Sequence, residues 1–147
     1  MSTATTRSIR DVTVGEELPP VSFPLTVYRL VMEAGANRDF NSIHHNTEYA
    51  RATGAEEMYA NTSFLLGMWE RTVREWLGLQ GAITAIRGFR MRSFNYVGDT
   101  TTVHARVTEV STDGSGGVTL QVWSENSRGV TVGPGAVTVT LPSRAVA

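Results

Sequence analysis

A short polar loop, residues 35–46, carries the residues of this chain best suited to proton transfer. Asp39 and His44 lie five positions apart in it, with Asn41 and Asn46 close by. A carboxylate and an imidazole held near each other can activate a water molecule and deliver a proton. The same residue types also serve loop architecture, because Asp and Asn side chains hydrogen-bond nearby backbone donors. Spacing alone leaves both interpretations open.

The composition argues against several other chemistries. The chain has no cysteine, so it offers neither a disulfide framework nor a thiolate. All 13 basic residues are arginine, which excludes Schiff-base chemistry on lysine. Adjacent His44 and His45 seldom bind one ion, and the third histidine, His104, falls in a predicted strand, so we expect no metal site. A net charge of −1 gives no indication of a nucleic-acid partner.

The length of 147 residues predicts one domain, residues 1–147, with a loose N-terminus over residues 1–10. No stretch approaches the run of about 18 apolar residues that a membrane span needs. The first eight residues lack a hydrophobic signal core, so we expect a cytoplasmic protein. A chain this small would gain from self-association that covers a sheet face.

Two helices are expected on either side of the loop. Thr26 is a plausible N-cap for a helix that Gly35 would end. The second helix is expected over residues 47–53, with Thr47 as its cap and Tyr49 and the following alanine facing inward.

The longest periodic segment runs from Asn61 or Thr62 to about Leu77 and predicts a mostly buried helix. The residues at helical spacing are Leu65, Trp69, Thr72, Val73 and Trp76. Glu70 and Glu75 are expected to face outward, because each can pair with an arginine four positions away.

The start of this helix, Asn61-Thr62-Ser63, has a possible second role. An ordinary N-cap cluster would have this composition. Free backbone N–H groups at a helix N-terminus can also bind an oxyanion or polarise a carbonyl group. The two interpretations are compatible.

Strands make up most of the remaining chain. A short edge strand is expected at residues 21–26, and four consecutive strands at 83–96, 100–110, 118–126 and 130–141. Arg90 and Arg92 would share one face of the first of these four, where they could recruit a phosphate-bearing ligand or form a solvated or interface face. This order predicts an α+β fold in which one long helix is wrapped by a curved antiparallel sheet.

The loop also carries a resemblance to a known family. Asp39-Phe-Asn-Ser-Ile-His44 resembles the D-x-N-P-I-H signature of the MaoC-like, (R)-specific enoyl-CoA hydratases, which have a hot-dog fold. Val97-Gly-Asp-Thr100 is similar to the family's V-x-x-G-D-T turn, and the resemblance covers nearly the whole chain. Ser42 replaces the usual proline, and Asn61-Thr-Ser63 stands where the family has His-Gly-Met.

One branch of the family is more similar than the others. Residues 37–46, 58–63 and 70–78 resemble the small subunit of the two-component hydratases that act on steroid side-chain enoyl-CoA esters. The resemblance implies an acyl-CoA substrate and no separate cofactor. It also implies an assembly that is either a homodimer or a heteromer with a second MaoC-like chain.

The activity implied by the resemblance is reversible hydration of a trans-2-enoyl-CoA to a 3-hydroxyacyl-CoA. Asp39 is then expected to be the general base and His44 to orient the water and share in proton delivery. The Thr62 N–H would polarise the thioester carbonyl, with Asn41 and Ser63 also at the substrate-binding site.

Two rival functions remain open on the sequence. An acyl-CoA thioesterase on the same fold would use an acidic residue on the central helix, for which Glu70 and Glu75 are the candidates. Alternatively, the chain is a non-catalytic, acyl-binding partner subunit of a hydratase complex.

Overall fold

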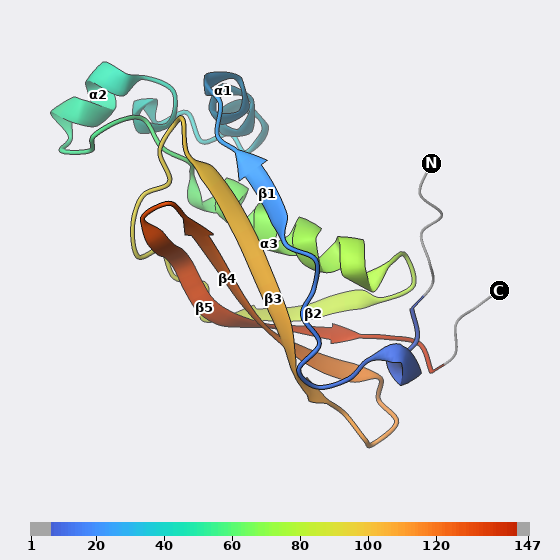
Figure 1. Ribbon diagram of the computed structural model, residues 1–147. Helices are drawn as coiled ribbons and strands as arrows, with labels where there is room; N and C mark the ends of the chain where they lie inside the picture. The colour runs from blue at the N-terminus through green and yellow to red at the C-terminus, as the bar shows by residue number, and fades with distance from the viewer. Residues whose placement is uncertain (1–6, 144–147) are drawn as a thin grey trace.

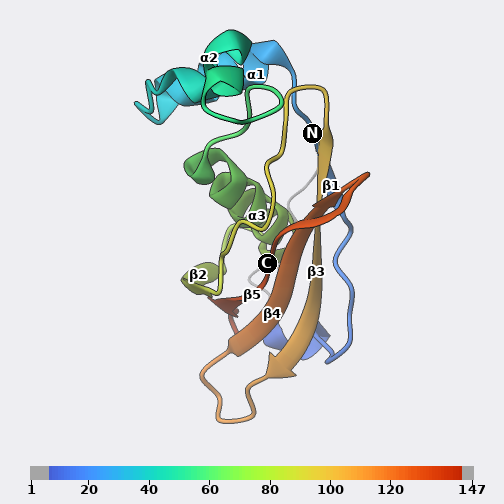
Figure 2. The ribbon, with the colours of Figure 1, turned by 90° about the vertical axis from the view of Figure 1, so that its left-hand side faces the viewer.

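The computed structural model describes residues 7–143 and shows a five-stranded antiparallel sheet curled around one long helix (Figures 1 and 2). The strands are β1 (Val21–Pro24), β2 (Ala82–Arg87), β3 (Thr100–Val110), β4 (Gly117–Asn126) and β5 (Gly129–Thr140). The helices are α1 (Val27–Ala36), α2 (Thr47–Ala52) and α3 (Thr62–Leu77), with short 3-10 turns η1 (Ile9–Asp11) and η2 (Ser42–His44). The predicted α+β architecture is therefore present.

The sheet has the order β1-β3-β4-β5-β2, so β1 and β2 form its two edges. Alternate residues of the three inner strands are buried on the concave face, as a period of two requires. They include Val103, Ala105, Val107, Val118, Leu120, Val122, Val137 and Val139. Pro24 lies in the edge strand β1, where its missing N–H costs no central pairing.

Helix α3 packs one face against this concave surface. Trp69 is fully buried there, and its Nε1–H donates to Ser124 Oγ in β4 at 2.8 Å. Gly78 ends the helix with φ of 76°, a conformation that favours glycine. The helix is less buried than predicted, because Thr62, Ser63 and other residues of its outer face remain exposed in the described chain.

Helices α1 and α2 lie together beyond the N-terminal end of α3 (Figures 1 and 2). Helix α1 does not end at Gly35 as predicted but continues to Ala36, with Asn37 as C-cap. The cap of α2 is Asn46 rather than Thr47, because the Asn46 side chain accepts the N–H of Tyr49, the third residue of the helix.

Tyr49 was predicted to face inward and is half exposed. Only Ala50 of α2 is buried, since a helix this short presents little more than one residue to the core.

The strand predicted over residues 83–96 ends at Arg87. Gly88 has φ of 67°, which takes the backbone out of the extended region. The chain then follows β5 irregularly, through an isolated bridge between Met91 and Val132. Arg90 and Arg92 are both exposed, but the predicted strand that would have given them a common face is absent.

Of the N-terminus predicted to be loose, residues 1–6 lie outside the described range, and residues 7–10 contact the rest of the chain. Ser8 is buried, and the Ile9 N–H donates to the Pro142 carbonyl at 3.0 Å. Within residues 7–143, no helix is both long and apolar enough to cross a membrane.

Candidate active site

Asp39 and His44 lie in contact. His44 Nε2 is 3.2 Å from Asp39 Oδ2, and the two side chains are 9% and 40% exposed, respectively. The imidazole is thus enclosed while the carboxylate remains open to solvent. His45 points elsewhere, with its Nε2 3.3 Å from the Phe40 carbonyl. The loop therefore presents one acid–imidazole pair, and only the first histidine belongs to it.

The tautomer of His44 is determined by the backbone of Tyr59. His44 Nδ1 lies 2.8 Å from the Tyr59 carbonyl oxygen, which can only accept a hydrogen bond. Nδ1 must therefore carry a proton whether the ring is neutral or charged. The other nitrogen, Nε2, is left to exchange a proton with Asp39 or with a bound molecule.

Asparagine side chains shape the loop around this pair. Asn41 Oδ1 accepts the Ile43 N–H at 3.2 Å and starts turn η2, which ends at His44. Asn46 Oδ1 accepts the Tyr49 N–H at 2.8 Å and starts α2. The Asn41 contact is of the kind by which asparagine builds loops, and the substrate-binding role expected for Asn41 stays a prediction.

The start of α3 is joined to the same loop. Asn37 Nδ2 donates to Asn61 Oδ1 at 3.4 Å, and Tyr59, which binds His44, precedes Thr62 by three positions. Both sides of the Asp39–His44 segment are therefore attached to the chain that leads into α3.

Helix α3 presents unused donors at this end. Asn61 Oδ1 accepts the Phe64 N–H at 2.7 Å, but the N–H groups of Thr62 and Ser63 have no acceptor within the helix. The side chains of these two residues are exposed. Asn61 is 3% exposed, and its Nδ2 finds no acceptor among the residues that the structure describes. The positive end of the helix dipole favours negative charge at this position.

Tyr59 is the functional residue that sequence reasoning missed. Besides binding His44, its ring lies edge-on to the imidazole, with centroids 5.3 Å apart, and stacks on Phe94 at 4.1 Å. Burial, and the nearby Tyr96 and Asp39, raise the pKa of the Tyr59 phenol, which stays protonated at neutral pH. The contact with His44 is made by the backbone carbonyl oxygen of Tyr59, which every residue type has. The sequence therefore gave no indication of this contact.

A groove of about 540 Å³ runs between α1 and α3, with Asn37 and Ser63 in its lining. Phe23, Phe64 and Met68 supply apolar surface in it. Four charged residues also line it, namely Arg29, Glu33, Glu70 and Arg71, and the Asp39–His44 pair does not. The groove therefore offers space beside the start of α3 that is partly apolar and partly charged.

The acidic residues of α3 face outward, as predicted. Glu70 Oε1 accepts from Arg74 at 3.0 Å, and Glu75 Oε1 accepts from Arg71 at 2.9 Å. Each carboxylate is about half exposed. Among residues 7–143 no group of three His, Cys, Asp or Glu side chains is arranged to bind a metal ion.

Comparison with known proteins identifies the family. No protein-family model matches the sequence. The chain is 32% identical over 116 residues to the 3-oxo-4,17-pregnadiene-20-carboxyl-CoA hydratase beta subunit of Mycobacterium tuberculosis, a match that covers 79% of this chain and 87% of that protein. The chain belongs to the MaoC-like hydratase family.

Solved structures agree with this assignment. A chain in the crystal structure of the ChsH1-ChsH2 complex from Mycobacterium tuberculosis is 30% identical, with a TM-score of 0.82 over 88% of this chain and 98% of that one. The (R)-hydratase from A. caviae involved in PHA biosynthesis is 21% identical, with a TM-score of 0.82 over 90% and 99%. The second likeness concerns the fold alone, and together they confirm the predicted hot-dog fold.

Proposed function

We propose that this chain is the catalytic subunit of an enoyl-CoA hydratase, which reversibly converts a trans-2-enoyl-CoA to a 3-hydroxyacyl-CoA. The observation that carries the proposal is the contact between Asp39 and His44, in which Tyr59 holds the imidazole so that Nε2 faces the carboxylate. A positioned acid–base pair of this kind typically contributes about 10²–10⁴-fold to a rate.

The two side chains have complementary roles in the hydration direction. Asp39 accepts a proton from water as the water oxygen forms its bond to the β-carbon of the substrate. The α-carbon then takes the Nε2 proton of His44, which acts as an imidazolium protonated on both nitrogens and becomes neutral in this step. The proton on Asp39 returns to His44 across their 3.2 Å contact, which restores the starting state after the net addition of one water molecule.

The start of α3 would bind the thioester. Negative charge develops on the thioester carbonyl oxygen when the β-carbon is attacked, and N–H donors already in place stabilise it without reorganising. The Thr62 N–H is free to serve this purpose, and the Ser63 N–H is a second free donor beside it. The groove between α1 and α3 supplies space for an acyl group next to them.

The acyl group is proposed to be bulky, of the steroid side-chain class. The support is the relative that is a 3-oxo-4,17-pregnadiene-20-carboxyl-CoA hydratase subunit. That relative is a beta subunit, and the similar solved chain comes from a two-component complex, so we propose a second MaoC-like chain as partner. The outer face of α1 exposes Val27, Tyr28, Val31 and Met32, an apolar surface consistent with a protein partner.

The test begins with the complex purified from its native source, whose mass and composition identify a second chain or a homodimer. The complex is then incubated with an enoyl-CoA, and 3-hydroxyacyl-CoA and free CoA are both quantified. Hydrated acyl-CoA supports the proposal, whereas release of free CoA indicates a thioesterase. Unchanged hydration by a complex that carries Asp39→Asn would assign the chemistry to the partner and make this chain the acyl-binding subunit.

A further inference from the structure

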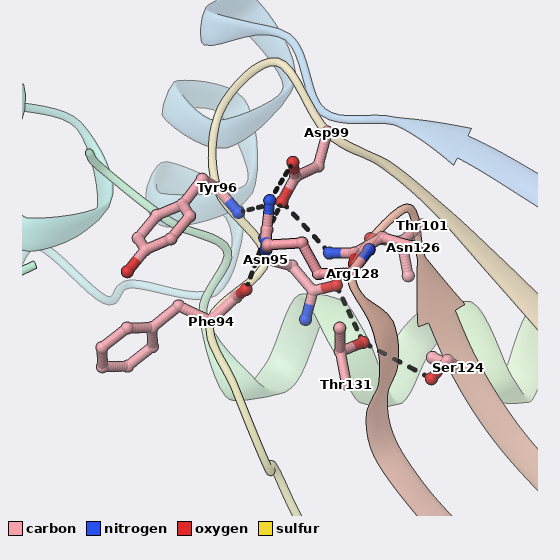
Figure 3. A network of polar contacts seen from close by, with 9 residues as sticks. All are labelled: Phe94, Asn95, Tyr96, Asp99, Thr101, Ser124, Asn126, Arg128 and Thr131. Atoms are coloured by element: carbon pink, nitrogen blue, oxygen red, sulfur yellow. Dashed lines mark hydrogen bonds and ion pairs between the residues drawn. The ribbon is translucent and has the colours of Figure 1, made fainter. Parts of the chain in front are cut away.

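A second charged pair, Asp99 with Arg128, lies on the other side of the Tyr59 segment from His44. Arg128 donates from Nη2 to Asp99 Oδ2 at 2.6 Å and from Nη1 to Oδ1 at 2.9 Å (Figure 3). Asp99 Oδ2 also accepts the Tyr96 N–H at 2.8 Å and Asn126 Nδ2 at 3.2 Å. The hydrogen bonds that Arg128 donates to Asp99 raise the pKa of Arg128. The pair is held in a fixed geometry by these four hydrogen bonds.

Arg128 fixes both ends of the loop formed by residues 94–99. Its Nη2 donates to the Phe94 carbonyl at 3.1 Å as well as to Asp99. Between these points Asn95 is fully buried, and its Oδ1 accepts from the hydroxyls of Thr101 and Thr131, each at 2.9 Å. The loop thus has a defined backbone position despite having no regular secondary structure.

This loop pairs directly with the segment that binds His44. The Ala60 N–H donates to the Asn95 carbonyl at 2.9 Å, and the Val97 N–H donates to the Met58 carbonyl at 2.9 Å. Tyr59 lies opposite Tyr96 in the resulting antiparallel bridge. The position of residues 58–60 is therefore set by the 94–99 loop.

The backbone of Tyr59 faces the other way, as alternation along an extended segment requires. Its N–H donates to the Ile43 carbonyl at 3.3 Å, and its carbonyl accepts from His44 Nδ1 at 2.8 Å. Residues 58–60 thus lie between two partners, the loop held by Arg128 on one side and turn η2 on the other.

Aromatic side chains also connect the 94–99 loop to His44 through Tyr59. The rings of Phe94 and Tyr96 project to one side of the loop, away from Asp99 (Figure 3). The Phe94 ring stacks on Tyr59, which in turn packs against the His44 imidazole. Arg128 holds the Phe94 carbonyl directly, so a shift of this carbonyl would move the ring that supports Tyr59.

We infer that Arg128 and Asp99 are positioning residues for His44, acting through residues 58–60. The inference rests on the proposed function in that His44 is there a proton-transfer group. Loss of the arginine fork releases the Phe94 carbonyl and leaves the largely buried Asp99 without its counter-ion. The Tyr59 carbonyl then moves or becomes mobile, and His44 Nδ1 loses its fixed acceptor.

The test is the tautomeric state of His44, observed in the ¹⁵N-histidine-labelled chain by long-range ¹H–¹⁵N correlation. At a pH where the imidazole is neutral, the wild-type ring is expected to show its single proton fixed on Nδ1. In Arg128→Gln the His44 signals should shift toward a mixture of tautomers or broaden. His104, which stacks on Trp123 and whose Nε2 lies 3.0 Å from Glu125 Oε1, reports in the same spectrum whether the sheet stays folded.

Arg74→Gln is the matched control variant, because Arg74 also pairs with a carboxylate but lies on the outer face of α3. Arg128→Lys keeps the charge without the two-pronged fork and is expected to give a smaller change than Arg128→Gln. It is the deciding variant if Arg128→Gln unfolds, which would be seen as collapse of the His104 signals. Unchanged His44 signals in a folded Arg128 variant would overturn the inference.

In the purified complex, Arg128→Gln should lower kcat by about 10- to 100-fold with little change in KM, since misplacement of a catalytic group costs rate rather than ground-state binding. An effect on KM alone would contradict the positioning role. The tautomer measurement needs no substrate, so it stands or fails separately from the proposed hydratase activity.

Discussion

The molecule contains two aspartate–base pairs with opposite properties. The Asp39 carboxylate is 40% exposed, and among residues 7–143 its only ion-pair contact is with His44. The Asp99 carboxylate is 12% exposed and accepts hydrogen bonds from Tyr96, Asn126 and both terminal nitrogens of Arg128. A carboxylate has about four lone-pair sites, so Asp99 is saturated while Asp39 has sites free for water.

The basic partners of the two aspartates, His44 and Arg128, also differ in whether they can exchange a proton. Imidazole gains and loses a proton near neutral pH, whereas guanidinium stays charged throughout. The Asp39 pair therefore has the residue types that the proposed proton transfer needs, whereas the Asp99 pair is suited to holding the backbone in place. One pair is suited to chemistry because its hydrogen bonding is incomplete, and the other to support because its hydrogen bonding is complete.

The largest effect is expected from the incomplete pair. Asp39→Asn and His44→Ala should each lower the hydration rate of the complex by about 10²–10⁴-fold, because each removes a positioned acid or base. Thermal unfolding of Asp39→Asn should change little, since the side chain has few contacts to lose. Steady-state kinetics and a thermal melt check both parts, and a near-full rate would remove Asp39 from the mechanism.

Substitution in the Asp99–Arg128 pair, unlike Asp39→Asn, should lower the stability of the chain. Asp99→Asn is expected to lower the free energy of unfolding by about 2–3 kcal/mol, because hydrogen bonds to a charged acceptor are lost and Arg128 is left without its partner. Urea denaturation of the isolated chain measures this loss. A stability equal to that of the wild type would show that the Asp99 network contributes little.

Glu16 provides an intermediate case with a pH signature. Burial tends to raise the pKa of Glu16, but hydrogen bonds from Trp76 Nε1, at 2.9 Å, and from Arg7 outweigh it and hold the pKa below its ordinary value of 4.5. A lowered folded-state pKa stabilises the fold above the unfolded-state value, and this contribution is lost as the pH falls through the folded-state pKa.

Glu16→Gln should therefore destabilise the chain by about 1–2 kcal/mol at pH 7. The difference from wild type should shrink as the pH falls below 4.5. Denaturation curves at several pH values test this, and a pH-independent difference would contradict the ionic origin of the effect.

The smallest effect is expected from the exposed pairs of α3. Arg74→Gln should change the free energy of unfolding by no more than about 0.5 kcal/mol, because i,i+4 pairs in solvent contribute little. The hydration rate should not change. A loss of stability of about 2 kcal/mol or more is the size expected when a buried, charged hydrogen bond is removed. Such a loss would show that another chain covers this face of α3.

The fold was largely predictable because its main elements carry clear periodicity. The helix predicted to end near Leu77 and to begin at Asn61 or Thr62 is confirmed as α3, since a 3.6-residue apolar period extends over its whole length. The prediction failed at residues 88–96, where apolar and arginine residues alternate loosely. There Gly88, with its positive φ, ends the strand, and the position of the chain depends on β5.

The proximity of Asp39 and His44 was also predictable, because both lie in one short loop. What the sequence could not indicate was the direction of the imidazole. That direction depends on a carbonyl oxygen of Tyr59, which is present in every residue type and gives no signal.

The sequence by itself therefore determined the elements of the protein, the composition of the loop and the presence of an acid with an imidazole. The tertiary structure alone decided which aspartate is saturated and which is free. Asp39 and Asp99 are the same residue type, each in a turn-forming segment, and they differ only in the donors that distant segments bring to them. Hydrogen-bond saturation is a property of three-dimensional neighbours. For this reason the sequence could indicate the Asp39–His44 pair as a candidate site, but it could not show how Asp39 and Asp99 differ.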